Sequence, residues 1–130
     1  MSSLRGNAMT SELYTSMYQF WNKVLPAWPS NTVPTGTALP YLTYTPVSSE
    51  WGTSTLGTAI IWSRSSSFRT ATEAADKVEA LIPAVVGTKI PLTGGGLWIK
   101  RGTPFIQHYP QEDPDEKAIY INYEVRSYIV

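Results

Sequence analysis

Residues able to support acid–base, nucleophilic or metal chemistry are scarce in this chain of 130 residues. It contains one histidine, His108, and no cysteine. A Ser-His-Asp arrangement would have to use His108, yet the chain lacks the Gly-x-Ser-x-Gly turn that presents a nucleophilic serine in one large class of hydrolases. A single histidine without cysteines also excludes the usual zinc ligand sets. We therefore expect His108 to be a structural residue at a strand edge, and we expect no enzyme and no catalytic, metal or cofactor-binding residues.

The densest group of ionisable side chains is acidic. Four carboxylates lie within five positions, at Glu112, Asp113, Asp115 and Glu116. Carboxylates in such number can hold a hard cation such as Ca²⁺. The glycine and the distal glutamate of an EF-hand loop are missing, however, so a solvated hairpin loop is the favoured interpretation. A negatively charged lining that keeps DNA from adhering inside an assembly is the open alternative.

The chain is rich in aromatic residues and poor in charge. It has five tryptophans and eight tyrosines, while charged residues make up 15% instead of the usual ~25%. Protein interfaces favour this combination. We expect oligomer or partner contacts at aromatic residues in or near loops, namely Trp28, Tyr41, Trp51 and Trp98. Because the same rings could stack on sugars, a carbohydrate-binding module is an alternative.

Ten basic residues balance ten acidic ones, and the isoelectric point is about 6.6. This balance gives no electrostatic reason to expect binding to nucleic acid or to an anionic membrane. No apolar run approaches the ~20 residues of a membrane span. The first residues also lack the apolar segment of a secretory signal. We expect expression in a cytoplasm and no membrane partner.

Hydrophobic periodicity predicts two helices. Apolar residues recur at helical spacing over 10–25, and Pro26 ends the pattern. A second helix is expected over 70–82, with a capping box between Thr70 and Glu73.

Segments typical of β-structure fill most of the remaining chain. Proline and glycine mark 26–40 as an extended connector, and 47–55 is expected to link two strands. The run Gly94-Gly95-Gly96 lacks the Gly-Lys-Ser/Thr ending of a phosphate loop and predicts a turn. The expected strands are 41–46, 56–63, 97–101, 105–109 and 117–129.

This order, α-β-β-α-β-β-β, predicts an α+β domain with a mainly antiparallel, twisted sheet flanked by two helices. Residues 1–9 are expected to form a flexible N-terminal arm, and residues 10–130 a single domain. Alternation in the last strand indicates one buried and one exposed face. Ile60, Trp62 and Ile121 are assigned to the core.

Several phrases of the chain resemble a known family. They are Pro40-Tyr41-Leu-Thr-Tyr44, Ala59-Ile60-Ile61-Trp62-Ser63, Ala74-Ala75-Asp76-Lys77-Val78, Arg101-Gly-Thr-Pro-Phe105-Ile-Gln107 and Ala118-Ile-Tyr-Ile-Asn122-Tyr-Glu-Val125. Together with the element order and the length, these phrases resemble the tail terminator or tail-completion proteins of long-tailed bacteriophages and prophages. The resemblance covers roughly residues 10–130.

The resemblance implies a role in assembly without catalysis. A hexameric ring would cap the head-proximal end of the tail tube, end its polymerisation and join the tail to the head connector. The partners would be the tail-tube protein and a head-completion or connector protein, while DNA would pass through the lumen without being specifically bound. The protein would belong to the tail of the virion at its head-proximal end, after assembly in the host cytoplasm.

In such a ring the acidic loop, defined as residues 112–116, would face the lumen. A neutral chain predicts no strongly acidic bore, however, unless its charges are segregated. Two alternatives stay open. One is another neck component, such as a stopper or head–tail joining protein, and the other is a carbohydrate- or protein-binding β-rich module.

Overall fold

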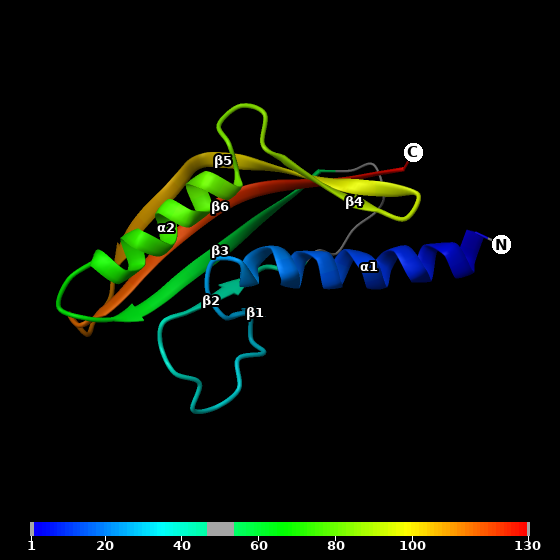
Figure 1. The fold of residues 1–130 in the computed structure, drawn as a ribbon. Coiled ribbons are helices and arrows are strands. Elements are labelled where there is room, and N and C mark those ends of the chain that lie inside the picture. Colours follow the sequence, from blue (N-terminus) through cyan, green and yellow to red (C-terminus); the bar gives the residue numbers. More distant parts are fainter. Residues whose placement is uncertain (1, 47–53, 130) are drawn as a thin grey trace.

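A computed structural model describes residues 2–46 and 54–129 of the chain, with side chains from residue 11 onward. This part of the chain contains two helices and six strands (Figure 1). In chain order they are α1 (Ser2–Asn22), β1 (Ala27–Pro29), β2 (Tyr41–Tyr44), β3 (Ser54–Arg64), α2 (Arg69–Leu81), β4 (Thr88–Leu92), β5 (Gly95–Pro110) and β6 (Glu116–Ile129).

All six strands form one sheet in the order β1-β2-β3-β6-β5-β4. β1 pairs with β2 in parallel, and the other neighbouring strands pair antiparallel. The α+β class and the two helices are therefore confirmed. The expected order α-β-β-α-β-β-β is wrong in detail, because it omits β1 and β4 and divides β5 in two, and the mainly antiparallel sheet includes one parallel pair.

The short strands β1 and β4 were not predicted from the sequence, because pairing with neighbouring strands, rather than their own residues, stabilises them. β1 lies inside the segment expected to be a connector, and its neighbour Ser30 donates its N–H to the Tyr44 carbonyl at 2.8 Å. β4 contains Pro91, which normally argues against a strand. β4 lies at the edge of the sheet, where a missing N–H is tolerated.

β5 is one long strand where two were expected. The Gly102-Thr103 pair indicates a turn in the sequence, yet the chain continues in the same direction and pairs with β6 on both sides of it. The register shifts between Arg101 and Ile106, an irregularity that accommodates Pro104 without a ladder hydrogen bond. The result is a long, bent β5–β6 hairpin that forms one side of the molecule (Figure 1).

α1 begins at Ser2, whereas the periodicity predicts a start at Thr10, so the helix includes most of the segment expected to be an arm. Gly6 costs only about 1 kcal/mol inside a helix, which is too little to end one by itself. The helix ends at Asn22, whose side-chain oxygen accepts the Ala27 N–H at 3.1 Å. The helix thus ends three residues before the predicted end of the pattern at Leu25, and this bond holds the chain where it turns from α1 into β1.

α2 covers nearly the predicted residues, but the predicted capping box is wrong. The helix starts at Arg69, so Thr70 lies inside the first turn and not ahead of it. The residue before the helix, Phe68, makes no side-chain cap bond, and Glu73 instead pairs with Arg69 at 3.2 Å.

Both helices pack on the same face of the sheet, here called the covered face. Met17 and Trp21 of α1 and Val78 of α2 are buried in one core with Ile121 of β6. Side chains alternate along β6, and the buried set on this face is Ile119, Ile121, Tyr123, Val125 and Ser127. The assignment of Ile121 to the core is confirmed.

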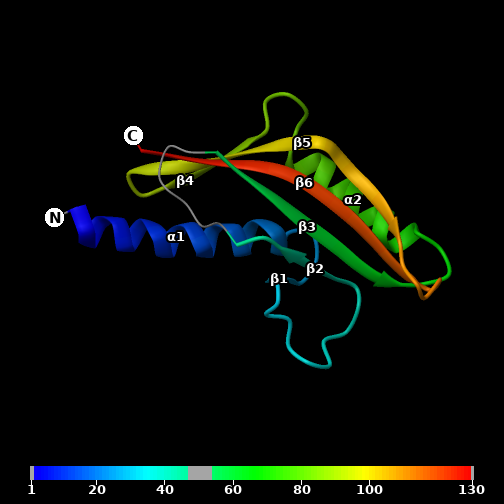
Figure 2. The same cartoon turned by 180° about the vertical axis from the view of Figure 1, so that it is seen from behind.

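The opposite, open face of the sheet carries no helix in the described part of the chain. Figure 2 shows β5 and β6 in front of α2 from this side. Ile60 and Trp62 alternate with the buried Ala59 and Ile61 of β3, so they lie on the open face and are half-buried. Their assignment to the core is therefore wrong, because a central strand with two apolar faces need not be covered on both.

Candidate interaction surfaces

Three of the four predicted interface residues, Trp28, Tyr41 and Trp98, lie on the open face and are half-buried. Trp51 lies outside the described residues. The Trp28 ring meets the Tyr41 ring edge-on, with the centroids 6.0 Å apart. The pairing register places Tyr41 opposite Trp62. The structure thus brings residues from three separate strands to one surface.

The open face contains further aromatic residues that sequence reasoning did not select. The rings of Tyr109 and Tyr120 lie 4.3 Å apart on the adjoining strands β5 and β6. Trp62 is fixed there by its indole N–H, which donates to Thr43 Oγ1 at 3.0 Å. The alternation of 117–129 already indicated that Tyr120 shares a face with charged residues, which was the available signal.

A cluster of cations surrounds Trp98 on the same face. The ammonium groups of Lys89 and Lys100 lie 4.9 Å and 4.2 Å from the centre of the Trp98 ring. Arg126 lies opposite Trp98 in the β5–β6 register. Lys89, Trp98, Arg126 and Tyr128 line a hollow of about 270 Å³. We call Lys89, Trp98, Lys100 and Arg126 the Trp98 patch.

The Trp98 ring has a fixed orientation. Its indole N–H donates to the Val86 carbonyl at 2.8 Å, which ties it to the loop between α2 and β4. Val85, the residue before Val86 in that loop, is 91% exposed and has a φ of 71°. Sequence reasoning selected Trp98 but missed its lysines and arginine, because they come from three strands and the net charge of the chain is zero.

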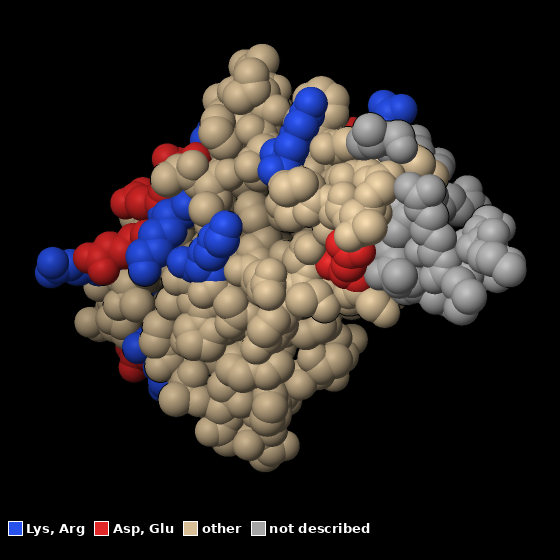
Figure 3. All heavy atoms as spheres, turned by 45° about the vertical axis from the view of Figure 1, so that its right-hand side comes forward, with Lys and Arg blue, Asp and Glu red and all other residues tan. Residues whose placement is uncertain are grey.

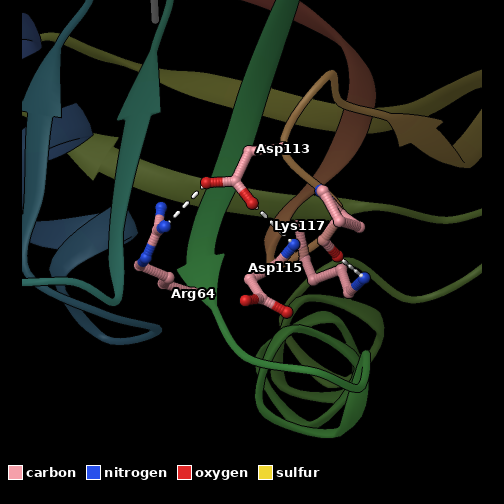
Figure 4. A network of polar contacts seen from close by, with 5 residues as sticks. Arg64, Asp113, Asp115 and Lys117 are labelled. Carbon is pink, nitrogen blue, oxygen red and sulfur yellow. Dashed lines mark hydrogen bonds and ion pairs between the residues drawn. The ribbon is translucent and has the colours of Figure 1, made fainter.

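The acidic loop is folded into a defined shape at the far end of the β5–β6 hairpin. Asp113 bridges to Arg64 at the end of β3, with 2.6 Å between guanidinium nitrogen and carboxylate oxygen. Its other oxygen accepts the N–H of Asp115 at 2.9 Å (Figure 4). The Asp115 carbonyl in turn accepts the N–H of Ser65 at 2.7 Å. The loop is therefore attached to the β3–α2 connection.

Hydrogen bonds and nearby cations set the ionisation of this loop. The N–H of Asp115 and the Arg64 guanidinium lower the pKa of Asp113, and the same ion pair raises the pKa of Arg64. Lys117 donates to the Pro114 carbonyl. Four carboxylates next to Arg64 and Lys117 leave a formal charge of −2. The solvated hairpin loop is thus the structure observed, and whether it faces a lumen stays a prediction.

Charge is segregated along the chain although it cancels overall. Only Glu12, Lys23 and Glu50 carry charge between residues 6 and 63, whereas the rest of the charged residues, apart from Arg5, lie from residue 64 onward. Figure 3 shows a broad uncharged area on the lower part of one side of the molecule. Residues 64–130 contain eight basic and eight acidic residues, so this distribution separates charged from uncharged parts of the chain and not one sign of charge from the other.

His108 lies near the acidic loop. Its ring meets the Phe68 ring edge-on, with the centroids 4.9 Å apart. A groove of about 380 Å³ passes beside it, and Glu116 and Lys117 contribute to the lining. The groove lining includes no serine or threonine, so the nucleophile of a Ser-His-Asp arrangement is missing from this groove.

Two further findings concern the described part of the chain. Among these side chains, no group of three or more His, Asp or Glu residues is placed to hold a metal ion. No helix within 2–46 or 54–129 combines the length and apolar character needed to cross a membrane.

Comparison with known proteins gives a likeness in fold. Neither a protein-family model nor a curated protein matches the chain. A chain in the solved structure described as "Virion of native gene transfer agent (GTA) particle" superposes with a TM-score of 0.55 and is 16% identical in sequence. The match covers 94% of this chain and 96% of that chain. At this identity the likeness shows that the two chains share a fold over nearly their whole lengths.

Proposed function

We propose that the chain is a non-enzymatic structural protein of a phage-like virion, and that it forms the ring that terminates a tail tube. The fold shared with a chain of a gene transfer agent virion, over nearly the full length of both, is the observation that carries the proposal. The phrases that resemble tail terminator proteins supply the more specific role.

The surfaces of the molecule suit a subunit of an assembly. One face of the sheet is left open and carries half-buried aromatic residues, the residue type that interfaces favour. A broad uncharged area lies elsewhere on the molecule (Figure 3). Contacts between different surfaces of identical chains can close a cyclic ring. In the proposed function the ring is hexameric, meets the tail-tube protein on one side and the head connector on the other, and lets DNA pass.

The native mass of the purified protein tests this function. Multi-angle light scattering across a concentration series, with and without purified tail-tube protein, should show a hexamer in at least one of the two conditions. A truncated tube protein that cannot polymerise is the matched control, because it should not seed a ring. A chain that stays monomeric at all concentrations, and does not bind assembled tubes in co-sedimentation, would contradict the proposal.

Another position in the neck is the alternative, because the virion comparison does not specify where in the particle the similar chain lies. A stopper or joining protein should bind the head connector in the absence of tubes, whereas a terminator should bind the tube end first. Binding of each partner, measured separately by co-sedimentation, distinguishes the two. A glycan-binding module would instead show quenching of tryptophan fluorescence when oligosaccharides are added.

A further inference from the structure

We propose that the Trp98 patch of one copy binds the acidic loop of the neighbouring copy, and that this contact joins the subunits of the ring. The inference rests on the proposed function, since it names the surfaces through which identical chains meet. Each surface contains several charged residues that make no ion pair with the side chains the structure describes.

The Trp98 patch is a cationic surface with an aromatic centre. Lys89 and Arg126 are exposed, Lys100 is half-buried, and none of the three pairs with an acidic side chain that the structure describes. Glu124 lies opposite Lys100 in the register, so the surface has a formal charge of +2. Stacking on the Trp98 ring directs the two ammonium groups and limits their freedom, which reduces the entropy lost when an anion binds.

The acidic loop is the complementary surface. Asp113 forms an ion pair with Arg64. The carboxylates of Glu112, Asp115 and Glu116 make no ion pair with the side chains that the structure describes. Glu112 and Asp115 are exposed. The bond from the Asp115 N–H to Asp113 and the bond from Ser65 to the loop fix its backbone before any partner arrives. The formal charge of −2 matches the +2 of the Trp98 patch.

One chain cannot bring its own two surfaces together. Trp98 pairs with Arg126 near one end of the β5–β6 hairpin, whereas Pro110 pairs with Lys117 beside the acidic loop at the other end. Arg126 and Lys117 are nine residues apart on β6, so at ~3.3 Å per residue along a strand the two surfaces lie on the order of 30 Å apart. The rigid hairpin therefore separates complementary charges, and only a second copy can satisfy them. Because the contact joins two different surfaces, it is of the head-to-tail type that generates rings.

A nucleic acid is the other polyanion that the patch could attract, since lysine, arginine and tryptophan are common in such sites. The second copy is favoured because the chain itself supplies a preorganised acidic surface of equal and opposite charge. DNA binding is accordingly an outcome of the test that would overturn the inference.

Charge reversal provides the experiment. One variant carries Lys89→Glu, Lys100→Glu and Arg126→Glu, and the other carries Glu112→Lys, Asp115→Lys and Glu116→Lys. Each variant alone faces like charge across the contact, so its self-association should weaken by on the order of tenfold or more. Mixed in equal amounts, the two variants are complementary again and should assemble to the mass of the wild-type oligomer, with the two chains alternating.

A matched control reverses two exposed cations away from both surfaces, Lys23→Glu and Lys77→Glu, and so shifts the net charge in the same direction as the Lys89/Lys100/Arg126 variant. This control should assemble like the wild type. Circular dichroism establishes that each variant is folded. If a triple variant does not fold, the single changes Lys89→Gln and Glu112→Gln and a salt titration of the wild-type oligomer replace it, and each should weaken association.

The outcomes separate the two proposals. If the wild type and both reversed variants assemble equally well, the contact is wrong and the ring proposal stands. If the wild type is monomeric with and without tail tubes, both proposals fail. If the wild type binds a labelled DNA duplex in fluorescence anisotropy and only the Lys89/Lys100/Arg126 variant loses that binding, the Trp98 patch is a nucleic-acid site, and the proposed contact is overturned.

Discussion

Trp21 and Trp98 lie on opposite faces of the sheet and differ in burial. Trp21 belongs to α1 and packs against the covered face, fully buried, with its ring 4.9 Å from Phe20 and 5.1 Å from Tyr123. Trp98 lies on the open face, half-buried between two lysines. The difference shows that the covered face holds aromatic rings inside the core, whereas the open face leaves them accessible to solvent.

The comparison also explains why composition alone is ambiguous. A high aromatic content fits both a dense core and an interface, and this chain places aromatic residues both in its core and on the open face of the sheet. Alternation along β3 and β6 assigns neighbouring residues to opposite faces, but only the position of the helices decides which face is buried. Substitutions on the two faces should therefore have separable effects on unfolding and on assembly.

Removal of the Trp21 side chain should give the largest effect. Trp21→Ala should lower the free energy of unfolding by about 3–5 kcal/mol, because a large buried aromatic leaves a cavity that its neighbours fill only in part. Urea denaturation followed by circular dichroism measures this loss.

Trp98→Ala is the control on the open face. It should cost about 1 kcal/mol, since it removes one hydrogen bond and two cation–π contacts at a partly exposed site. Equal losses for the two variants would show that the open face contributes to the core and would remove the distinction between the faces.

Alkaline pH should weaken the covered face through its buried tyrosines. Burial raises the pKa of Tyr44 to about 12, with a smaller contribution from Tyr18, and burial also raises the pKa of Tyr123. A tyrosine in the unfolded chain ionises near pH 10. The stabilising effect of keeping these protons is thus complete below pH 10 and is lost as the pH rises towards 12.

The urea midpoint should accordingly fall between pH 10 and pH 12. Tyrosinate absorbance should rise in a second step that coincides with unfolding. Tyr44→Phe should reduce this pH dependence, because the variant has no proton to lose at that position. An identical pH dependence in the wild type and in Tyr44→Phe would contradict the assigned role of Tyr44.

Long periodic segments were predictable because their signal is contained in their own residues. The second helix was expected over 70–82 and spans Arg69–Leu81, and the last strand was expected over 117–129 and spans Glu116–Ile129. β1 and β4 were missed because three- and five-residue strands form only when a partner strand pairs with them. β5 was predicted as two strands because Gly102 and Thr103 are typical turn residues. Only the pairing with β6 shows that the strand continues through them with a shift in register.

The interaction surfaces were predictable only in part. Trp28, Tyr41 and Trp98 were selected for their type and location near loops, and the structure places all three on the open face. Two of the cations around Trp98 were not predictable, because Lys89 and Arg126 reach it through strand pairing, whereas Lys100 follows it by two residues on the same strand. The attachment of Asp113 to Arg64 likewise joins residues that are 49 positions apart.

Val85 gives the smallest effect and tests how far the recognition surface extends beyond Trp98. Its φ of 71° lies in the left-handed region, where a β-branched residue is strained. The Val86 N–H donates to the Ala84 carbonyl at 2.8 Å across this tight turn, while the Val85 side chain remains 91% exposed. Val85→Gly should therefore relieve strain without loss of packing and raise the free energy of unfolding by up to about 1 kcal/mol.

The same variant then discriminates between two roles for this loop. If an exposed, strained valine beside the Trp98 patch takes part in the contact between copies, Val85→Gly should stabilise the monomer and yet weaken the oligomer. Val86→Ala is the control, because Val86 holds Trp98 through its backbone carbonyl, which the substitution leaves in place. Higher stability with unchanged association would confine recognition to the charged groups around Trp98, whereas lower stability would show that the valine side chain supports the fold.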